Sequence, residues 1–288
     1  MYKFLLRFAF SFQNSLVITL FAVIFFSVAA LVSAQTQPTA GGATAQTSAG
    51  ATKTASPATT VQEFYKAMRE KRFRDALMMT NLRAAVEKLT TAEMIDLTPD
   101  FEPMSTRVPE KIDLSGEQIS GNLASVFVKA NDPQTNELKL DELKLRRENN
   151  EWLILTADAD AEKQAKNEGS GYFFKMRLEA RHADVEMTLQ DLSKAELAYA
   201  LQYNGQYADF PTLAKENLFP ADAVNADLMG YRFRLQLSSD KKKYQVNAEP
   251  VQYGKTGKFS FLLASGDAKN ASVIRKEDKN GAPLSAKN

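Results

Sequence analysis

The chain has 288 residues, which is long enough for two ordinary domains. Its 36 lysines and arginines are balanced by 35 aspartates and glutamates, so no strong field would draw nucleic acid or an anionic membrane to it. The absence of cysteine excludes disulfides, thiolate metal sites, cysteine nucleophiles and lipid attachment through a cysteine.

Residues 1–34 have the pattern of an export signal. Lys3 and Arg7 precede a long apolar run that closes with the sequence VSA, which fits peptidase cleavage after Ala34. The alternative is an uncleaved membrane anchor, because the apolar run of residues 16–32 approaches the roughly 20 residues that span a bilayer. Both alternatives export the remaining chain to the periplasm or the extracellular space, and the second leaves it anchored to the inner membrane.

Residues 35–58 contain only small and polar side chains, one lysine and two prolines. Such a segment cannot bury enough apolar surface to offset the entropy lost on ordering. We expect a disordered tether over this stretch, followed by a first domain at residues 59–157.

The first domain is predicted to begin with helices. Thr60 is a candidate N-cap, and Glu63 three residues later would complete a capping box. The apolar positions that follow are spaced by three and four residues, as on one face of a helix: Val61, Phe64, Tyr65 and Met68.

After residue 109 the apolar spacing changes to two, which predicts strands. Alternating segments occupy residues 111–130, 137–147 and 151–157, and the turn sequences NDPQTN and ENN separate them. Helices followed by an antiparallel sheet of three or four strands make an α+β domain.

The order of these elements resembles the exported members of the NTF2-like superfamily. The resemblance depends on the sequence VQEFYKAMREKRFRDAL at residues 61–77 and on the last strand, NEWLILTA, with Trp152. It implies a cone-shaped pocket, for which Tyr65, Phe101, Phe127 and Trp152 are the candidate lining residues. Enzymes of that family use a carboxylate and often a histidine, and residues 59–157 contain no histidine, so we expect a non-catalytic domain.

A connector is expected at residues 158–172. Asp158, Asp160 and Glu162 bear some similarity to a calcium loop, but the glycine and the closing glutamate of that motif are missing. Acidic residues at the start of a helix explain this spacing better, so no metal is expected.

The second domain is predicted at residues 173–288, as one long helix packed on an antiparallel sheet. The helix should run over residues 173–203 and end at Asn204-Gly205. Strand patterns follow in the sequences YRFRLQL, YQVNAEP, KFSFLLASG and SVIRKED.

The sequence GKTG at residues 254–257 is similar to the end of a phosphate-binding loop. That motif needs a glycine where this chain has Glu249, and a helix after the loop, where this chain has a strand pattern. We therefore expect Gly254 and Gly257 to be turn glycines that allow positive φ between two strands, and no nucleotide cofactor.

Four segments of this domain together resemble the globular domain of type IV pilins and pseudopilins: residues 191–219, 230–235, 244–261 and 272–283. The most specific part is the run from Ala248 to Phe261. A pilin anchors its subunit by an apolar start of the long helix, whereas this helix begins with Lys175, Arg177, Glu179 and Arg181. Those charges do not fit a membrane or an apolar filament core, so the resemblance implies a pilin-like head without the filament-forming stem.

No catalytic constellation emerges from the sequence. His182 is the only histidine and is expected at the surface or at an edge, and one histidine makes neither a triad nor a metal site. We expect a non-enzymatic scaffold or interaction module of the bacterial envelope whose partners are envelope proteins, in the setting of a secretion or pilus-like system. The alternative is a small-ligand-binding protein or weak enzyme that uses the NTF2-like pocket.

Overall fold

The computed structural model describes residues 55–132, 135–266 and 272–285. They divide into two compact units: the first contains the described residues from 55 to 170, and the second those from 171 onward. The predicted signal of residues 1–34 and most of the predicted tether lie outside the described residues. None of the helices in the described ranges is long and apolar enough to cross a membrane.

Helices form the beginning and the end of the first unit. Four precede the sheet and one follows it: α3 (Pro57–Arg69), α4 (Phe73–Met78), α5 (Arg83–Val86), α6 (Thr91–Ser105) and α7 (Ala159–Glu168).

Helix α3 begins earlier than the sequence pattern indicated. Its N-cap is Ser56, whose Oγ accepts a hydrogen bond from the Thr59 N–H at 3.1 Å, and Pro57 occupies the first helical turn. Serine followed by proline is a favourable helix start, because the proline lacks only an N–H that would have no partner there. The expected cap at Thr60 and the expected end of the tether at residue 58 are therefore wrong.

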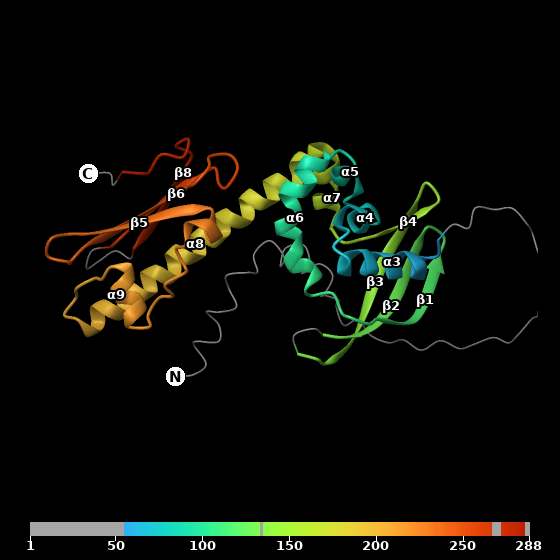
Figure 1. Cartoon of the computed structure of the whole chain (residues 1–288), viewed down its shortest axis with the longest axis horizontal. Helices are drawn as coiled ribbons and strands as arrows, with labels where there is room; N and C mark the ends of the chain where they lie inside the picture. Colours follow the sequence, from blue (N-terminus) through green and yellow to red (C-terminus); the bar gives the residue numbers. More distant parts are fainter. Residues whose placement is uncertain (1–54, 133–134, 267–271, 286–288) are drawn as a thin grey trace, which may run out of the picture. The chain divides into compact units, whose positions relative to one another are not determined.

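The sheet of the first unit is an antiparallel meander in the order β1-β2-β3-β4. Its strands are β1 (Asp113–Ser120), β2 (Leu123–Asn131), β3 (Leu138–Glu148) and β4 (Glu151–Ile154). Helix α3 packs against this sheet, as Figure 1 shows. Val126 and Val128 of β2 are buried, whereas Phe127 points to the opposite face, because side chains alternate along a strand.

The predicted connector at residues 158–172 is mostly helix α7, and the first unit extends to Ser170. Asp158 is the N-cap of α7, since its Oδ1 accepts the Ala161 N–H at 2.8 Å. The acidic residues here start a helix, as the sequence favoured, and that helix packs against α5 within the first unit.

The second unit combines one long helix with a second antiparallel meander. Its elements are α8 (Gly171–Gln202), α9 (Phe210–Lys215), α10 (Ala226–Met229), β5 (Tyr231–Leu237), β6 (Tyr244–Pro250), β7 (Ser260–Ala264) and β8 (Val273–Glu277), with the strand order β5-β6-β7-β8. Each unit is thus α+β, with helices and a four-stranded antiparallel sheet.

The core of the second unit lies between α8 and its sheet. Val185, Leu189 and Leu192 of the helix are fully buried, and Val246 and Phe261 of the sheet belong to the same cluster. These helix positions recur at spacings of three and four, so they form one stripe that faces the sheet.

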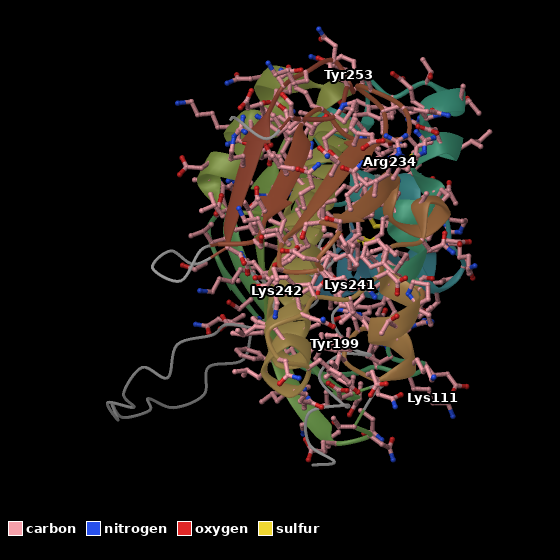
Figure 2. The ribbon with its side chains drawn as sticks, turned by 90° about the vertical axis from the view of Figure 1, so that its left-hand side faces the viewer. Lys111, Tyr199, Arg234, Lys241, Lys242 and Tyr253 are labelled. Carbon is pink, nitrogen blue, oxygen red and sulfur yellow. The ribbon has the colours of Figure 1, made fainter. Side chains whose placement is uncertain are left out.

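Two turns close this core. Asn204 and Gly205 both have positive φ at the end of α8, and the Gly205 N–H donates to the Ala200 carbonyl at 2.8 Å. Figure 2 labels Lys241 and Lys242 in the turn between β5 and β6. The Lys242 ammonium donates to the Asn204 carbonyl, so this lysine turn holds the end of α8.

Candidate functional site

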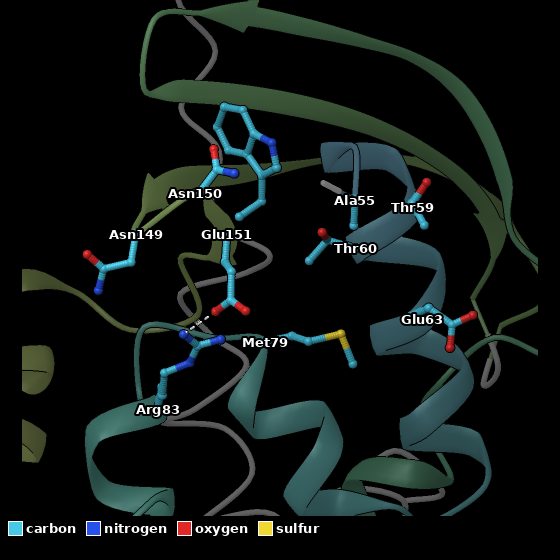
Figure 3. A pocket seen from close by; sticks show the side chains of 10 residues that line it. Ala55, Thr59, Thr60, Glu63, Met79, Arg83, Asn149, Asn150 and Glu151 are labelled. Atoms are coloured by element: carbon cyan, nitrogen blue, oxygen red, sulfur yellow. Dashed lines mark hydrogen bonds and ion pairs between the residues drawn. The ribbon is translucent and has the colours of Figure 1, made fainter. Parts of the chain in front are cut away.

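A pocket of about 500 Å³ opens in the first unit, beside the turn that joins β3 to β4 (Figure 3). Segments far apart in the sequence supply its walls: the start of α3, the end of α4 with the start of α5, and the β3–β4 turn with β4. The lining residues are Ala55, Thr59, Thr60, Glu63, Met79, Arg83, Asn149, Asn150, Glu151 and Trp152.

The turn at the pocket is rigid. Asn149 and Asn150 both have positive φ, at 48° and 68°, which is the geometry of a two-residue hairpin turn whose twist matches its strands. Asparagine tolerates this backbone conformation better than most residues, which is why the pair suits the position. The Arg147 guanidinium donates to Oδ1 of Asn150 and so fixes that side chain further.

An ion pair ties the two walls of the pocket together. Nη1 of Arg83 donates to Oε2 of Glu151 at 2.6 Å, and the Arg83 Nε donates to the Met78 carbonyl at 2.8 Å (Figure 3). The Glu151 side chain is 61% exposed, so the pair adds little to stability. The other carboxylate oxygen of Glu151 makes no hydrogen bond or ion pair to a described residue. It can therefore accept a hydrogen bond from a ligand.

Trp152 forms the apolar part of the pocket. Only 7% of this residue is exposed, and the Arg147 guanidinium lies 5.8 Å from the centre of its ring. The indole N–H makes no hydrogen bond to any residue in the described ranges. A donor in that position on a nearly buried side chain can be satisfied by a group that enters the pocket.

The structure brings one of the four candidate pocket residues to this site. Trp152 lines the pocket, but Tyr65, Phe101 and Phe127 do not. Phe101 is 3% exposed and packs on Phe73 at 5.8 Å between ring centres. Tyr65 packs edge-on against its neighbour Phe64, and burial raises the pKa of its hydroxyl, with a smaller contribution from the Asp141 carboxylate. Phe127 lies on the sheet face opposite to Val126 and Val128.

Sequence reasoning missed Thr59, Glu63 and Arg83 as pocket residues. Arg83 and Glu151 are 68 residues apart, and only the packing of the helices against the sheet brings them together. The one local signal was the Asn149-Asn150 pair, which the sequence indicated only as a turn.

The glycine loop of residues 251–259 connects β6 to β7, which pair antiparallel. Gly254 has φ +77°, as a turn glycine allows, whereas Gly257 does not have positive φ. Gly257 is needed for a different reason: a Cβ there would lie 2.0 Å from the Tyr231 hydroxyl oxygen. The ring of Tyr231 occupies the space that a side chain would take.

His182 is buried, so the expectation of a surface histidine is wrong. It is 6% exposed, and its Nε2 accepts the Lys258 N–H at 3.0 Å. Burial, reinforced by the nearby Lys276 ammonium, lowers the pKa of its imidazole to about 4. The histidine therefore holds the end of the glycine loop as a neutral acceptor.

The described residues contain no group of three or more histidine, cysteine, aspartate or glutamate side chains placed to hold a metal ion. Comparison of the chain with protein-family models gives no match, and neither do comparisons with curated proteins and with solved structures.

Proposed function

We propose that this chain is an exported, non-enzymatic interaction protein of the bacterial envelope that holds a partner at the pocket beside the β3–β4 turn. The observation that carries the proposal is the composition of that pocket. It offers an indole, amides, hydroxyls, the Glu63 carboxylate and one ion pair, which are groups that bind and orient; the Thr59 and Thr60 hydroxyls bond to Ser56 and not to a carboxylate that could activate them. Carboxylate and guanidinium already neutralise one another in the Arg83–Glu151 pair.

The setting of the proposal comes from the sequence. The export signal of residues 1–34 would place both units outside the cytoplasm, and the tether would give them reach from the membrane if the signal stays uncleaved. The NTF2-like resemblance of the first unit and the pilin-like resemblance of the second favour a scaffold in a secretion or pilus-like system. Two four-stranded α+β units are compatible with both resemblances.

Cross-linking in the envelope tests the proposal. Residues 35–288 are expected to recover one or more envelope proteins, and a Thr59→Tyr variant is expected to recover much less, because the added ring fills the pocket from the start of α3. Thr106→Tyr is the matched control, since Thr106 is exposed at the end of α6 and lies outside the pocket. Equal recovery by all three chains would contradict the proposal, provided that circular dichroism shows all three folded.

Small-ligand binding is the second candidate function, and the pocket volume favours it. A volume of about 500 Å³ lies within the range of roughly 300–1,000 Å³ that is typical of small-molecule sites. A ligand-binding protein would saturate with a small molecule in the absence of any protein partner, which separates the two functions experimentally.

A further inference from the structure

We infer that the occupant of the pocket is a peptide segment with a basic side chain, an inference that rests on the proposed function and names the chemistry of its partner. The starting observation is Trp152. Its side chain is more than nine-tenths buried, it lines the pocket, and its indole N–H has no partner among the described residues. That N–H is not among the buried polar atoms that lack a partner, so it is open to solvent, and a group that accepts a hydrogen bond, such as a peptide carbonyl, can replace water there.

The charge of the lining selects a cation. Glu63 and Glu151 carry two negative charges, and Arg83 carries one positive charge that is already paired with Glu151. Glu63 is exposed on α3 and makes no ion pair within the described ranges, so it can pair with an incoming ammonium or guanidinium. Arg147 bonds to Asn150 and lies over Trp152, so the unpaired negative charge of the pocket is at Glu63 on α3, and it is there that a cation is favoured over an anion.

The hydrogen-bonding capacity of the pocket matches a polypeptide backbone. The Asn149 amide and the second carboxylate oxygen of Glu151 make no hydrogen bonds to described residues. The amide can donate hydrogen bonds to a ligand, and the carboxylate oxygen can accept them. Each peptide unit presents one N–H and one carbonyl, so it can use both kinds of group at once. The rigid turn at Asn149 and Asn150 holds these groups in place before a ligand arrives, which lowers the entropic cost of binding.

The ring of Trp152 already has the Arg147 guanidinium 5.8 Å from its centre, so the preference for a cation comes from Glu63 and the ring supplies apolar surface. A lysine or arginine side chain can lay its apolar stem along Met79 and Trp152 while its charged end reaches Glu63.

Fluorescence of the full exported chain tests this inference directly, because Trp152 is its only tryptophan. The probes are three capped tripeptides, with acetyl-Ala and Ala-amide around a central lysine, norleucine or glutamate. The lysine peptide is expected to change the fluorescence saturably and to bind about three- to fivefold more tightly than the norleucine peptide, with the glutamate peptide weakest; this is the size of an exposed ion pair. Added salt should reduce the preference for lysine.

Glu63→Gln is expected to abolish the preference for lysine over norleucine and to leave binding of norleucine unchanged. Glu87→Gln is the control, since Glu87 is exposed in the same unit and lies outside the pocket. Equal binding of the lysine and norleucine peptides, or no response to any of the three, would overturn the inference. If cross-linking is still lost in Thr59→Tyr, only the ligand class is wrong. If cross-linking is unaffected, the proposed function fails as well.

Discussion

Both units of this protein bury glutamates, and Glu162 of the first and Glu196 of the second are held in opposite ways; the second unit also buries Glu249, which pairs with Arg234 at 2.6 Å. Glu162 of α7, in the first unit, is 7% exposed and accepts hydrogen bonds from Arg146 at 2.7 Å, Lys166 at 2.5 Å and Asn81 at 3.2 Å. Glu196 of α8, in the second unit, is fully buried and accepts one bond, from the Ala208 N–H at 3.0 Å. Its other oxygen has no partner among the described residues.

The number of hydrogen-bond partners decides whether each of these two buried carboxyls is charged. Burial on its own raises the pKa of both carboxyls. At Glu162 that effect is outweighed by the bonds from Arg146, Lys166 and Asn81, which lower the pKa to about 2. At Glu196 burial prevails over the single backbone bond and raises the pKa to about 7. The first unit thus stabilises a buried charge, and the second keeps a carboxyl near the point of neutralisation.

The difference extends to how each unit is held together. In the first unit Asn81 joins the helices to the end of the sheet: its Nδ2 donates to the Ala157 carbonyl at 2.7 Å, and its Oδ1 accepts the Thr156 N–H at 3.0 Å. In the second unit the close approach of Tyr231 to Gly257 is a steric constraint, because a Cβ at residue 257 would lie 2.0 Å from the Tyr231 hydroxyl oxygen.

Asn81→Ala should have the largest effect, because it removes the centre of the polar network. The substitution leaves the buried Thr156 N–H and Ala157 carbonyl without their side-chain partner and removes a donor to Glu162. We expect a loss of about 4 kcal/mol, since each unsatisfied buried group costs roughly 1–3 kcal/mol. Denaturant unfolding followed by Trp152 fluorescence reports this unit alone. Asn122→Ala, at an exposed turn residue, is the control, and an equally small change in both variants would contradict the role of Asn81.

Gly257→Ala should come next, with a loss of about 3 kcal/mol. Its methyl group would collide with Tyr231, which is fully buried and donates to the Phe259 carbonyl at 2.9 Å, so overpacking and a lost hydrogen bond combine. Gly254→Ala is the matched control in the same loop. The added methyl group at residue 254 meets no atom within 4 Å. The substitution should therefore lower the stability only by the strain of positive φ, which is about 1 kcal/mol. Thermal melts followed by near-ultraviolet circular dichroism of the tyrosines compare the two, and a larger loss at Gly254 would contradict the steric account.

Much of the backbone could be predicted from the sequence, because strands and helices leave local patterns. The alternating segments YRFRLQL and YQVNAEP coincide with β5 and β6, and the long helix begins two residues before the expected position. The start of α3 was missed because Ser56-Pro57 lies in a polar stretch that resembles a tether.

The side-chain environments could not be predicted in the same way. His182 lies between charged residues in the sequence, yet the packing of α8 on the sheet buries it against Phe259, at 4.9 Å between ring centres. The aromatic residues chosen for a pocket were distributed over both faces of the sheet and the core, and polar residues from three separate segments line the pocket instead. A contact between two residues that are 77 positions apart, such as His182 and Phe259, leaves no local pattern.

Glu196→Gln should change the pH dependence of the second unit. The pKa of Glu196 is raised in the folded state from 4.5 to about 7, so its contribution to stability is fully present below pH 4.5 and is lost as the pH rises through 7. Glutamine keeps an acceptor for the Ala208 N–H and carries no charge. We expect this variant to be more stable than the original chain at pH 8, by about 2–3 kcal/mol, and equal to it near pH 4. Thermal melts of both chains between pH 4 and pH 8 measure this difference. A variant that is less stable than the original chain at pH 8 would show that the buried carboxylate has a partner.

His182 should produce the smallest of these effects, and of opposite sign. Its pKa is lowered in the folded state from 6.5 to about 4, so the stability it contributes is present above pH 6.5 and is lost as the pH falls towards 4. Protonation removes the acceptor that binds the Lys258 N–H and places a second charge near Lys276.

Between pH 4.5 and 6.5 the stability lost at His182 on acidification and the stability lost at Glu196 on alkalinisation offset one another. The effect of His182 is therefore measured in the Glu196→Gln background. There we expect a loss of about 1–2 kcal/mol from pH 7 to pH 5, which His182→Gln abolishes. The two positions are about 21 Å apart along α8, so their effects should add. A flat profile in the Glu196→Gln background would show that the histidine changes its partner on protonation at no cost in stability.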